Sequence, residues 1–318
     1  MAKQKRKTVL IIISMLMAFV LLYLYIAVIL TPKDGFSRGG ANFYRDTAIK
    51  TEERNSLDVI VLGNSDVEYS INPLQIFKDT GITTYNLGQA KNSPNGMKHQ
   101  LKSVLKKQSP KVVVVDTSCF YLKNTAKRDL GFASFFVAPF KFHVRWKDLK
   151  PKDFVTLPKY RSDDYKGFIN AENVYPYTMP ENYMGNMDSA SPLAIEQSIK
   201  DDMKEIYTMC NQNNIKLVFV CIPVPMDWDE ARSKGSQEFA DELGVPYIDF
   251  NLVDKYISLD YSTSFKDAGG HVNNKGAKVI SRYLSNYLPT VCNFEDKRTN
   301  PKYEKWNQLV NQYNYLLV

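Results

Sequence analysis

Short apolar runs rich in β-branched residues recur along the chain and alternate with longer segments of helical periodicity. The apolar runs lie at 57–62, 83–87, 111–116, 216–222 and 245–250, and the helical segments lie at 95–107, 193–212, 229–243 and 274–287. Residues 66–79 are expected to form a turn and a helix, with Asn72 as N-cap and Pro73 at the first helical position. Continuous apolar strands separated by helices are typical of a parallel sheet covered on both faces. The pattern predicts an α/β fold, a flavodoxin-like three-layer sandwich with a central parallel sheet. Ligands of such folds bind at the carboxyl ends of the strands.

The amino-terminal segment has a different pattern, a long apolar run behind a basic tail. The first seven residues carry four positive charges, and the 22 residues from Val9 to Leu30 carry none. About 20 apolar residues span the hydrocarbon core of a bilayer. The run ends without an A-x-A-like cleavage site, which favours an uncleaved anchor over a signal peptide. We expect a single-pass protein of the cell membrane, with its N-terminus inside and the chain after about Lys33 extracellular.

These two patterns divide the chain into segments. A basic cytoplasmic tail covers residues 1–8, a transmembrane anchor 9–30 and a polar linker 31–54. The α/β domain covers 55–292 and contains an insertion at 119–191, and a helical extension follows at 293–318. About 285 residues outside the membrane suffice for one large domain.

Charge and composition exclude several functions. Without the four bases of the tail, 37 Lys and Arg face 34 Asp and Glu, and they form no clustered basic face of the kind that nucleic-acid binders present. The four cysteines form no CxxC pair, no Cys/His group has metal-ligand spacing, and neither GxGxxG nor GxxxxGK[ST] occurs. No metal, nucleotide or flavin cofactor is implied, and the cysteine spacing does not require disulfides.

The insertion at 119–191 is rich in aromatic residues. Structureless loops of this length are uncommon in compact domains, so a subdomain beside the strand ends is expected. Its aromatic side chains could stack on sugar rings or pack against one another, and packing is the more common role. They are Phe120, Tyr121, Phe132, Phe135, Phe136, Phe140, Phe142, Trp146, Phe154, Tyr160, Tyr165, Phe168, Tyr175, Tyr177 and Tyr183.

Ser65 is a candidate nucleophile. The strand at 57–62 stops at Gly63 and Asn64, and the serine follows directly. This position places Ser65 at the carboxyl end of a buried strand. A serine after a glycine turn is more often a simple turn residue, so the assignment depends on catalytic partners elsewhere in the chain.

His271 is the histidine best placed to be that partner. It precedes the last predicted helix and follows Gly269 and Gly270, which indicates a loop, and Asp267 lies four residues earlier. A nearby carboxylate can orient an imidazole and stabilise its protonated form, as serine catalysis requires. His99 lies in a predicted helix and His143 lies among aromatic residues, so a structural role is expected for both.

Three short blocks together resemble those of the SGNH/GDSL hydrolase superfamily. They are Gly63-Asn64-Ser65, Asn86-Leu87-Gly88-Gln89, and the stretch from Asp267 through His271-Val272-Asn273 to Gly276-Ala277. More narrowly, the chain is similar to membrane-anchored cell-envelope proteins related to the D-alanyl transfer protein of teichoic acid synthesis and to alginate O-acetylation proteins. The resemblance implies Ser65 as nucleophile, His271 as base, Asp267 as its orienting acid, and the Gly88 N–H as an oxyanion donor.

Two positions depart from the family pattern. The family commonly has two residues between Asp and His, whereas three lie between Asp267 and His271. The family also places an Asn after the third strand as an oxyanion donor, where this chain has Asp116-Thr117-Ser118-Cys119. Ser118 could donate in its place, or backbone groups could serve alone.

The resemblance implies a serine esterase or O-acyltransferase that works through an acyl-serine. Its expected acceptor is a cell-surface polysaccharide or teichoic acid-type polymer, which would receive an O-acetyl or D-alanyl group. By analogy, a multi-spanning membrane acyltransferase would supply the acyl group, since one spanning helix cannot move it across the membrane. The alternative is a catalytically degenerate SGNH domain that binds glycan or assists envelope assembly.

Overall fold

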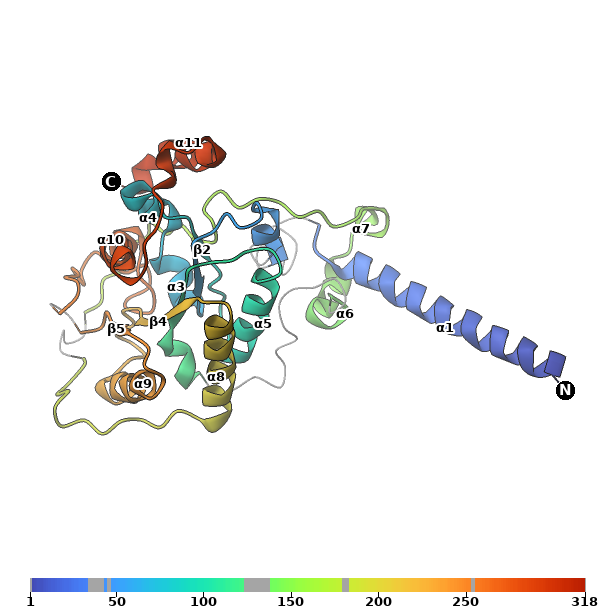
Figure 1. The fold of residues 1–318 in the computed structure, drawn as a ribbon, viewed down its shortest axis with the longest axis horizontal. Coiled ribbons are helices and arrows are strands. Elements are labelled where there is room, and N and C mark those ends of the chain that lie inside the picture. The colour runs from blue at the N-terminus through green and yellow to red at the C-terminus, as the bar shows by residue number, and fades with distance from the viewer. Residues whose placement is uncertain are drawn as a thin grey trace. The chain divides into compact units, whose positions relative to one another are not determined.

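The computed structural model of the chain describes residues 2–33, 43–44, 47–122, 138–178, 183–252 and 255–317. The chain forms two compact units (Figure 1). The smaller unit comprises residues 1–47 and 130–161, and the larger comprises 48–129 and 162–318. The segment that the sequence presents as one insertion, 119–191, is therefore shared between the two units.

A five-stranded parallel sheet forms the centre of the larger unit. Its strands are β1 (Val59–Leu62), β2 (Thr84–Asn86), β3 (Val112–Asp116), β4 (Lys216–Cys221) and β5 (Tyr247–Asp249). Their order is β2-β1-β3-β4-β5, and every pairing is parallel. All five strands were predicted from the apolar runs, and the α/β fold with a central parallel sheet is confirmed.

Helices cover both faces of this sheet. On one face, α10 (Asn274–Val291) packs against α3 (Ser65–Ser70) and α4 (Pro73–Thr80), over a core that includes Val59, Val61, Val112 and Val114. Helices α5 (Pro94–Val104), α8 (Gln197–Gln212) and α9 (Glu230–Leu243) lie on the other face, as the right-handed rule for connections between parallel strands requires for this strand order. There α5 packs against α8, and Phe239 of α9 stacks on Phe219 of β4.

Element ends differ from the predictions for local reasons. The predicted strand at 245–250 shortens to Tyr247–Asp249, because Pro246 has no N–H for the ladder although its carbonyl accepts from Phe219 N. The predicted helix at 274–287 continues to Val291. Pro289 lies in its last turn, so the single i→i−4 hydrogen bond lost with the proline N–H is near the end of the helix.

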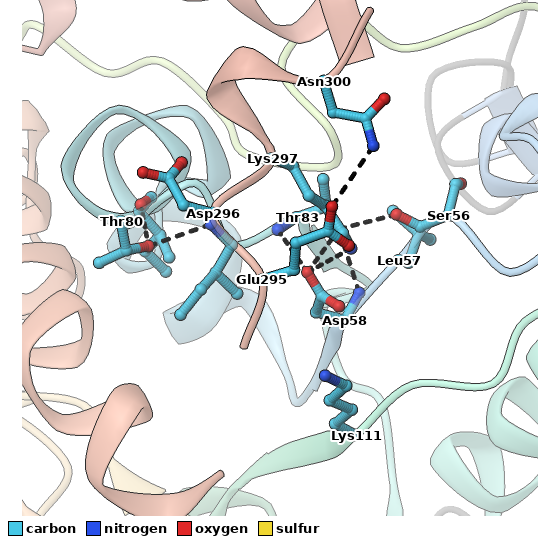
Figure 2. A network of polar contacts seen from close by, with 12 residues as sticks. Ser56, Leu57, Asp58, Thr80, Thr83, Lys111, Glu295, Asp296, Lys297 and Asn300 are labelled. Carbon is cyan, nitrogen blue, oxygen red and sulfur yellow. Dashed lines mark hydrogen bonds and ion pairs between the residues drawn. The ribbon is translucent and has the colours of Figure 1, made fainter. Parts of the chain in front are cut away.

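The carboxyl-terminal extension is fastened to the amino end of β1 (Figure 2). Lys297 Nζ lies 2.5 Å from Asp58 Oδ2 and 3.0 Å from Thr83 Oγ1, and both charged side chains are more than nine-tenths buried. The helix that follows, α11 (Glu304–Gln312), packs on α4 through Trp306 and Phe77, whose ring centroids lie 5.1 Å apart. A buried ion pair thus joins the extension at 293–318 to the sheet.

The outer edge of β2 is covered by the segment that begins at residue 162. Asn86 N donates to the Lys166 carbonyl at 2.9 Å, and Lys166 Nζ forms a buried ion pair with Glu52 at 2.7 Å. Gly167 has φ +91°, and a Cβ there would lie 1.7 Å from the Asn86 carbonyl oxygen. Only glycine fits this approach, which keeps the sheet edge paired.

The smaller unit is built around a long apolar helix, α1 (Ala2–Leu30). The stretch of this helix from Gln4 to Leu30 is long and apolar enough to cross a membrane. Three short elements pack against α1, namely α6 (Ala138–Lys141), the 3-10 helix η5 (His143–Asp148) and α7 (Pro151–Val155). The aromatic residues of the predicted insertion are divided between the units, and each unit holds both buried and exposed ones. Phe168 is buried and Tyr175 exposed in the larger unit, and Phe142 is buried and Trp146 exposed in the smaller unit. Phe132, Phe135 and Phe136 lie outside the described residues.

Candidate active site

Ser65 is held at the start of α3, directly beyond the carboxyl end of β1. Asn64 caps this helix, because its side-chain oxygen accepts from Asp66 N at 2.7 Å. Gly63 lets the chain turn, since a Cβ there would lie 2.6 Å from Val67 Cγ2 and 2.9 Å from Asp116 Cβ. The glycine turn therefore places the serine side chain where the sequence predicts it, half-buried at the sheet edge.

His271 is held by a tight loop in front of α10. The loop closes with an antiparallel bridge between Phe265 and Val272. Ala268 and Gly269 at its tip have φ values of 58° and 105°. A Cβ at Gly269 would lie 2.6 Å from the Tyr177 ring, so glycine is required there. The two left-handed residues accommodate the third residue between Asp267 and His271.

The three predicted catalytic residues meet in one hydrogen-bonded chain. His271 Nε2 lies 2.9 Å from Ser65 Oγ, and His271 Nδ1 lies 2.6 Å from Asp267 Oδ2. Asp267 Oδ1 accepts from the His271 backbone N–H at 2.6 Å, so one carboxylate fixes both the backbone and the ring of the histidine. This order of hydroxyl, imidazole and carboxylate has the geometry that nucleophilic catalysis by serine requires.

The environment of Asp267 favours its charged form. Partial burial raises the pKa of this carboxyl, but hydrogen bonds from His271 and electrostatic attraction to His271 and Lys266 outweigh that effect. Its pKa therefore lies below the ordinary value for aspartate. The ring of Tyr69 packs edge-on against the imidazole, with centroids 5.2 Å apart, and Lys266 Nζ lies 4.2 Å from the Tyr69 ring centroid.

A buried acid cluster lies behind the nucleophile. Ser118 Oγ contacts Asp66 Oδ2 at 2.9 Å and Asp116 Oδ2 at 2.5 Å, and it accepts from Asn64 Nδ2 at 2.9 Å. A serine hydroxyl has one proton and two lone pairs. It can donate to only one carboxylate, so all three contacts are satisfied when the other acid is protonated and donates to Ser118 Oγ.

Burial supports the same conclusion for the protonation of this cluster. Asp116 is fully buried, and burial together with the charge of Asp66 raises its pKa to about 8. Burial also raises the pKa of Asp66, whose Oδ1 lies 3.7 Å from His271 Nε2. The cluster thus holds at least one proton at neutral pH.

The structure gives the two residues proposed as oxyanion donors other hydrogen-bond partners. The Gly88 N–H donates to Asn86 Oδ1 at 2.9 Å, while Asn86 Nδ2 donates to the carbonyls of Val67 and Ile71. Ser118 is engaged by the acid cluster. The Asn86–Gly88 block therefore ties the end of β2 to α3, and neither predicted donor is directed to a substrate oxygen in this arrangement.

A pocket of about 360 Å³ opens over Ser65 and His271. Lys91 and Arg232 bring positive charge to its wall, but Arg232 is paired with Asp229, and Asp227 adds an exposed carboxylate. Tyr121 and Trp228 contribute aromatic surface. Their rings contact edge-on with centroids 5.7 Å apart. Lys91 has φ +59°, a left-handed conformation that side chains rarely adopt. The wall is therefore polar and aromatic, with charges of both signs.

The remaining candidates lie away from this pocket. His99 is exposed on α5, and His143 is exposed in the smaller unit, where Nδ1 lies 2.7 Å from the Phe140 carbonyl. The four cysteines are all free thiols, and Cys119 and Cys221 are fully buried. Within the described ranges, no group of three or more His, Cys, Asp or Glu side chains is arranged to hold a metal ion.

Sequence reasoning missed the acid cluster and the two basic side chains of the pocket wall, Lys91 and Arg232. Asp66 follows the serine directly and Asp116 ends the third strand, so both were visible as carboxylates at neighbouring strand ends. Lys91 and Arg232 gave no such signal, because a single lysine or arginine in a loop or helix is usually a solvated surface residue.

Comparisons with known proteins give only distant structural similarities. No family model matches the sequence, and no curated protein matches it. Among solved structures, the chain is similar to a GDSL-like lipase from Bacteroides thetaiotaomicron, with 11% identity, a TM-score of 0.40, and coverage of 79% of this chain and 99% of the lipase. It is also similar to a psychrotrophic esterase from Pseudoalteromonas sp., with 11% identity, a TM-score of 0.40, and coverage of 73% and 97%. Values this low leave the function to be argued from the site itself.

Proposed function

We propose that this protein is a serine esterase or O-acyltransferase of the SGNH type, and that Ser65 carries the acyl group. The observation that carries the proposal is the continuous chain from Ser65 Oγ through His271 to Asp267, with contacts of 2.9 and 2.6 Å. Nucleophile and base lie within hydrogen-bond reach, and a third group orients the base. The pocket above them gives a substrate access to the serine.

The reaction follows from this geometry in two half-reactions. His271 Nε2 takes the Ser65 proton while Oγ attacks the acyl carbonyl, and the same proton then passes to the departing alcohol oxygen. The products are the free alcohol and an acyl-serine. In the second half-reaction His271 deprotonates an acceptor hydroxyl or water, which attacks the acyl-serine, and the proton returns to Ser65 as the new ester or acid leaves.

The oxyanion of each tetrahedral intermediate requires hydrogen-bond donors. Ser65 is the first residue of α3, so its N–H has no acceptor within the helix. Lys91 lines the same pocket, and its backbone N–H has no acceptor among the described residues. We assign these two N–H groups as the donors in place of Gly88 and Ser118. One such donor contributes about 2.7–4 kcal/mol to transition-state stabilisation.

We propose a cell-surface polysaccharide or teichoic acid-type polymer as the acceptor. The polar and aromatic pocket wall supports a hydroxylated acceptor, and Lys91 would favour one with anionic groups. The proposal also includes a location outside the cytoplasmic membrane with α1 as anchor, and a multi-spanning membrane protein as acyl source. The length and apolar composition of α1 support the anchor.

The first test is turnover of p-nitrophenyl acetate by the full chain in detergent. Ser65→Ala and His271→Ala should each lower kcat by at least about 10³-fold, because nucleophile and base act as a unit. His99→Ala and Ser189→Ala are matched controls at exposed positions and should leave turnover unchanged. Circular dichroism would verify that the variants fold.

A fluorophosphonate probe tests the nucleophile directly. The wild-type chain should form a covalent adduct at Ser65, and Ser65→Ala should form none. Absence of both adduct and turnover in the folded wild type would remove the enzymatic proposal and leave the glycan-binding alternative. In an active protein, acyl transfer to a soluble sugar polymer in competition with hydrolysis would distinguish a transferase from an esterase.

A further inference from the structure

A buried arginine caps the carboxyl end of α1. Arg145 Nη1 donates to the carbonyls of Ile29, Leu30 and Thr31 at 3.2, 2.9 and 2.8 Å. Its Nη2 contacts Asp153 Oδ1 at 3.0 Å, and both charged side chains are only 2% exposed. The last carbonyls of a helix lack intrahelical donors and carry partial negative charge, so the guanidinium satisfies them and matches the helix dipole. Residues 138–161, here called the collar, are thereby fixed around this helix end.

The collar shortens the part of α1 that is free to contact lipid. Ala27, Ile29 and Leu30 are buried, whereas most residues from Val9 to Ile26 are exposed. Eighteen helical residues span about 27 Å, and the hydrocarbon core of a bilayer is about 30 Å thick. A membrane that covers the whole apolar run of α1 must therefore reach the level of the collar.

The collar itself presents apolar side chains at its surface. Trp146 is 65% exposed, Val155 85% and Leu157 69%. Phe140 and Phe154 are also exposed, and they adjoin the outer part of α1: the Phe140 ring lies 6.5 Å from that of Tyr23, and the Phe154 carbonyl accepts from Tyr25 Oη at 3.4 Å. The apolar surface of the helix thus continues onto the collar.

Exposed charges of the collar are mostly positive. Lys147, Lys150, Lys152, Lys159 and Arg161 are exposed, against one exposed carboxylate, Asp148. Apolar and aromatic side chains with lysines around them are typical of segments that lie in a membrane interface. The long lysine side chains can reach anionic head groups while the aromatic rings stay at the boundary of the acyl chains.

We propose that the collar is a second membrane contact, which inserts Trp146, Val155 and Leu157 shallowly into an anionic lipid surface around the end of α1. This inference depends on α1 crossing the membrane and is independent of the catalytic proposal. Crossing is tested separately, because a spanning helix keeps the full chain in vesicles after an alkaline carbonate wash whether or not the collar touches lipid.

The collar is tested by the depth of Trp146 in vesicles of phosphatidylglycerol and phosphatidylcholine that hold the full chain. Trp228 and Trp306 are each 4% exposed and are present in both the wild type and the Trp146→Phe variant. Subtracting the fluorescence emission of the variant from that of the wild type therefore gives the signal of Trp146. Lipids brominated near the top of the acyl chains should quench more than half of this difference signal. Lipids brominated near the chain ends should quench it less.

Variants of the apolar side chains and of the lysines test what brings Trp146 into contact with lipid. Val155→Asp with Leu157→Asp should reduce the quenching, whereas Val174→Asp, at an exposed position of the larger unit, should not. Replacing phosphatidylglycerol by phosphatidylcholine should weaken the quenching, as should Lys147→Gln with Lys150→Gln. A Trp146 signal that aqueous iodide quenches and brominated lipid does not would overturn the proposal and favour a protein partner on this surface.

Discussion

The single hydroxyl proton of Ser118 determines how the acid cluster behind the nucleophile responds to pH. With Asp66 and Asp116 both in contact with this hydroxyl, the arrangement is satisfied only while one acid keeps its proton. In the folded chain, Asp116 therefore keeps its proton up to about pH 8, whereas in the unfolded chain it releases the proton above about pH 4. Since the folded state binds more protons, Asp116 makes the free energy of unfolding decrease as pH rises from about 4 to about 8.

Asp116→Asn should remove this dependence. Asparagine imitates the protonated acid, because its amide can donate to Ser118 Oγ while its oxygen accepts from Ser118 N. We expect the melting temperature of the variant to decrease less between pH 5 and pH 8 than that of wild type. Asp227→Asn, at an exposed carboxylate of the same pocket, serves as control. Parallel pH profiles for wild type and Asp116→Asn would contradict a buried proton.

Asp267→Asn tests the orienting acid. The amide cannot stabilise a protonated imidazole as a carboxylate does, and we expect kcat for p-nitrophenyl acetate to decrease by about 10²–10⁴-fold with little change in fold. Lys266→Gln removes a neighbouring charge, since its Nζ lies 3.3 Å from Asp267 Oδ2, and should alter kcat only a few-fold. Full activity of Asp267→Asn would show that His271 is oriented by another group.

At the scale of elements, the ion pair of Lys297 and Asp58 holds the carboxyl-terminal extension to β1. Lys297→Met leaves a buried carboxylate without its cation and should lower the free energy of unfolding by about 3–5 kcal/mol. The double variant Lys297→Met with Asp58→Asn should recover part of this loss. Thermal or urea unfolding of the full chain in detergent measures both.

The matched control for this pair is an exposed ion pair in the same extension. Lys302 Nζ lies 3.8 Å from Glu53 Oε2, and their side chains are 44% and 68% exposed. Surface pairs contribute about 0–1 kcal/mol, so Lys302→Met should change stability little. Equal effects of Lys297→Met and Lys302→Met would mean that the buried pair does not fasten the extension.

The sequence predicts the elements well where each one carries its own signal. The continuous valines of 112–115 and the apolar run at Val59–Leu62 can only be buried strands in this context, and Asn72-Pro73 marks the start of α4 as expected. The proximity of Ser65, His271 and Asp267 was also predictable, because glycine turns place Ser65 and His271 at strand and helix ends. Strand ends were overestimated where a proline or a loop interrupts the ladder.

Long-range partners were not predictable in the same way. Nothing around Arg145 in the sequence indicates that it binds carbonyls more than 110 residues away, and an arginine near aromatic residues is usually solvated. For the same reason the insertion could not be divided between two units from its composition. The Gly88 N–H donates to the Asn86 side chain and so is not directed to a substrate oxygen. This depends on the orientation of the Asn86 side chain, which a sequence motif does not specify.

At the scale of the whole molecule, the anchor and its orientation can be tested without reference to catalysis. The full chain should remain with membranes after alkaline carbonate extraction, and Leu16→Arg, in the middle of α1, should weaken this retention because a charge at the bilayer centre is costly. Protease added outside intact spheroplasts should digest residues after α1 and spare the basic tail. Protection of the large unit would contradict the proposed orientation.

The closure of α1 by Arg145 also has a consequence for the synthesis of the protein. Arg145 lies 116 residues after Ile29, the first carbonyl that it binds. At translation rates of about 5–20 residues per second, the helix is complete roughly 6–23 s before the ribosome adds the arginine. During that interval the helix end depends on water or lipid head groups for its hydrogen bonds. Biogenesis of this protein therefore includes a late step, in which an apolar helix made early acquires its final cap from a part of the chain made much later.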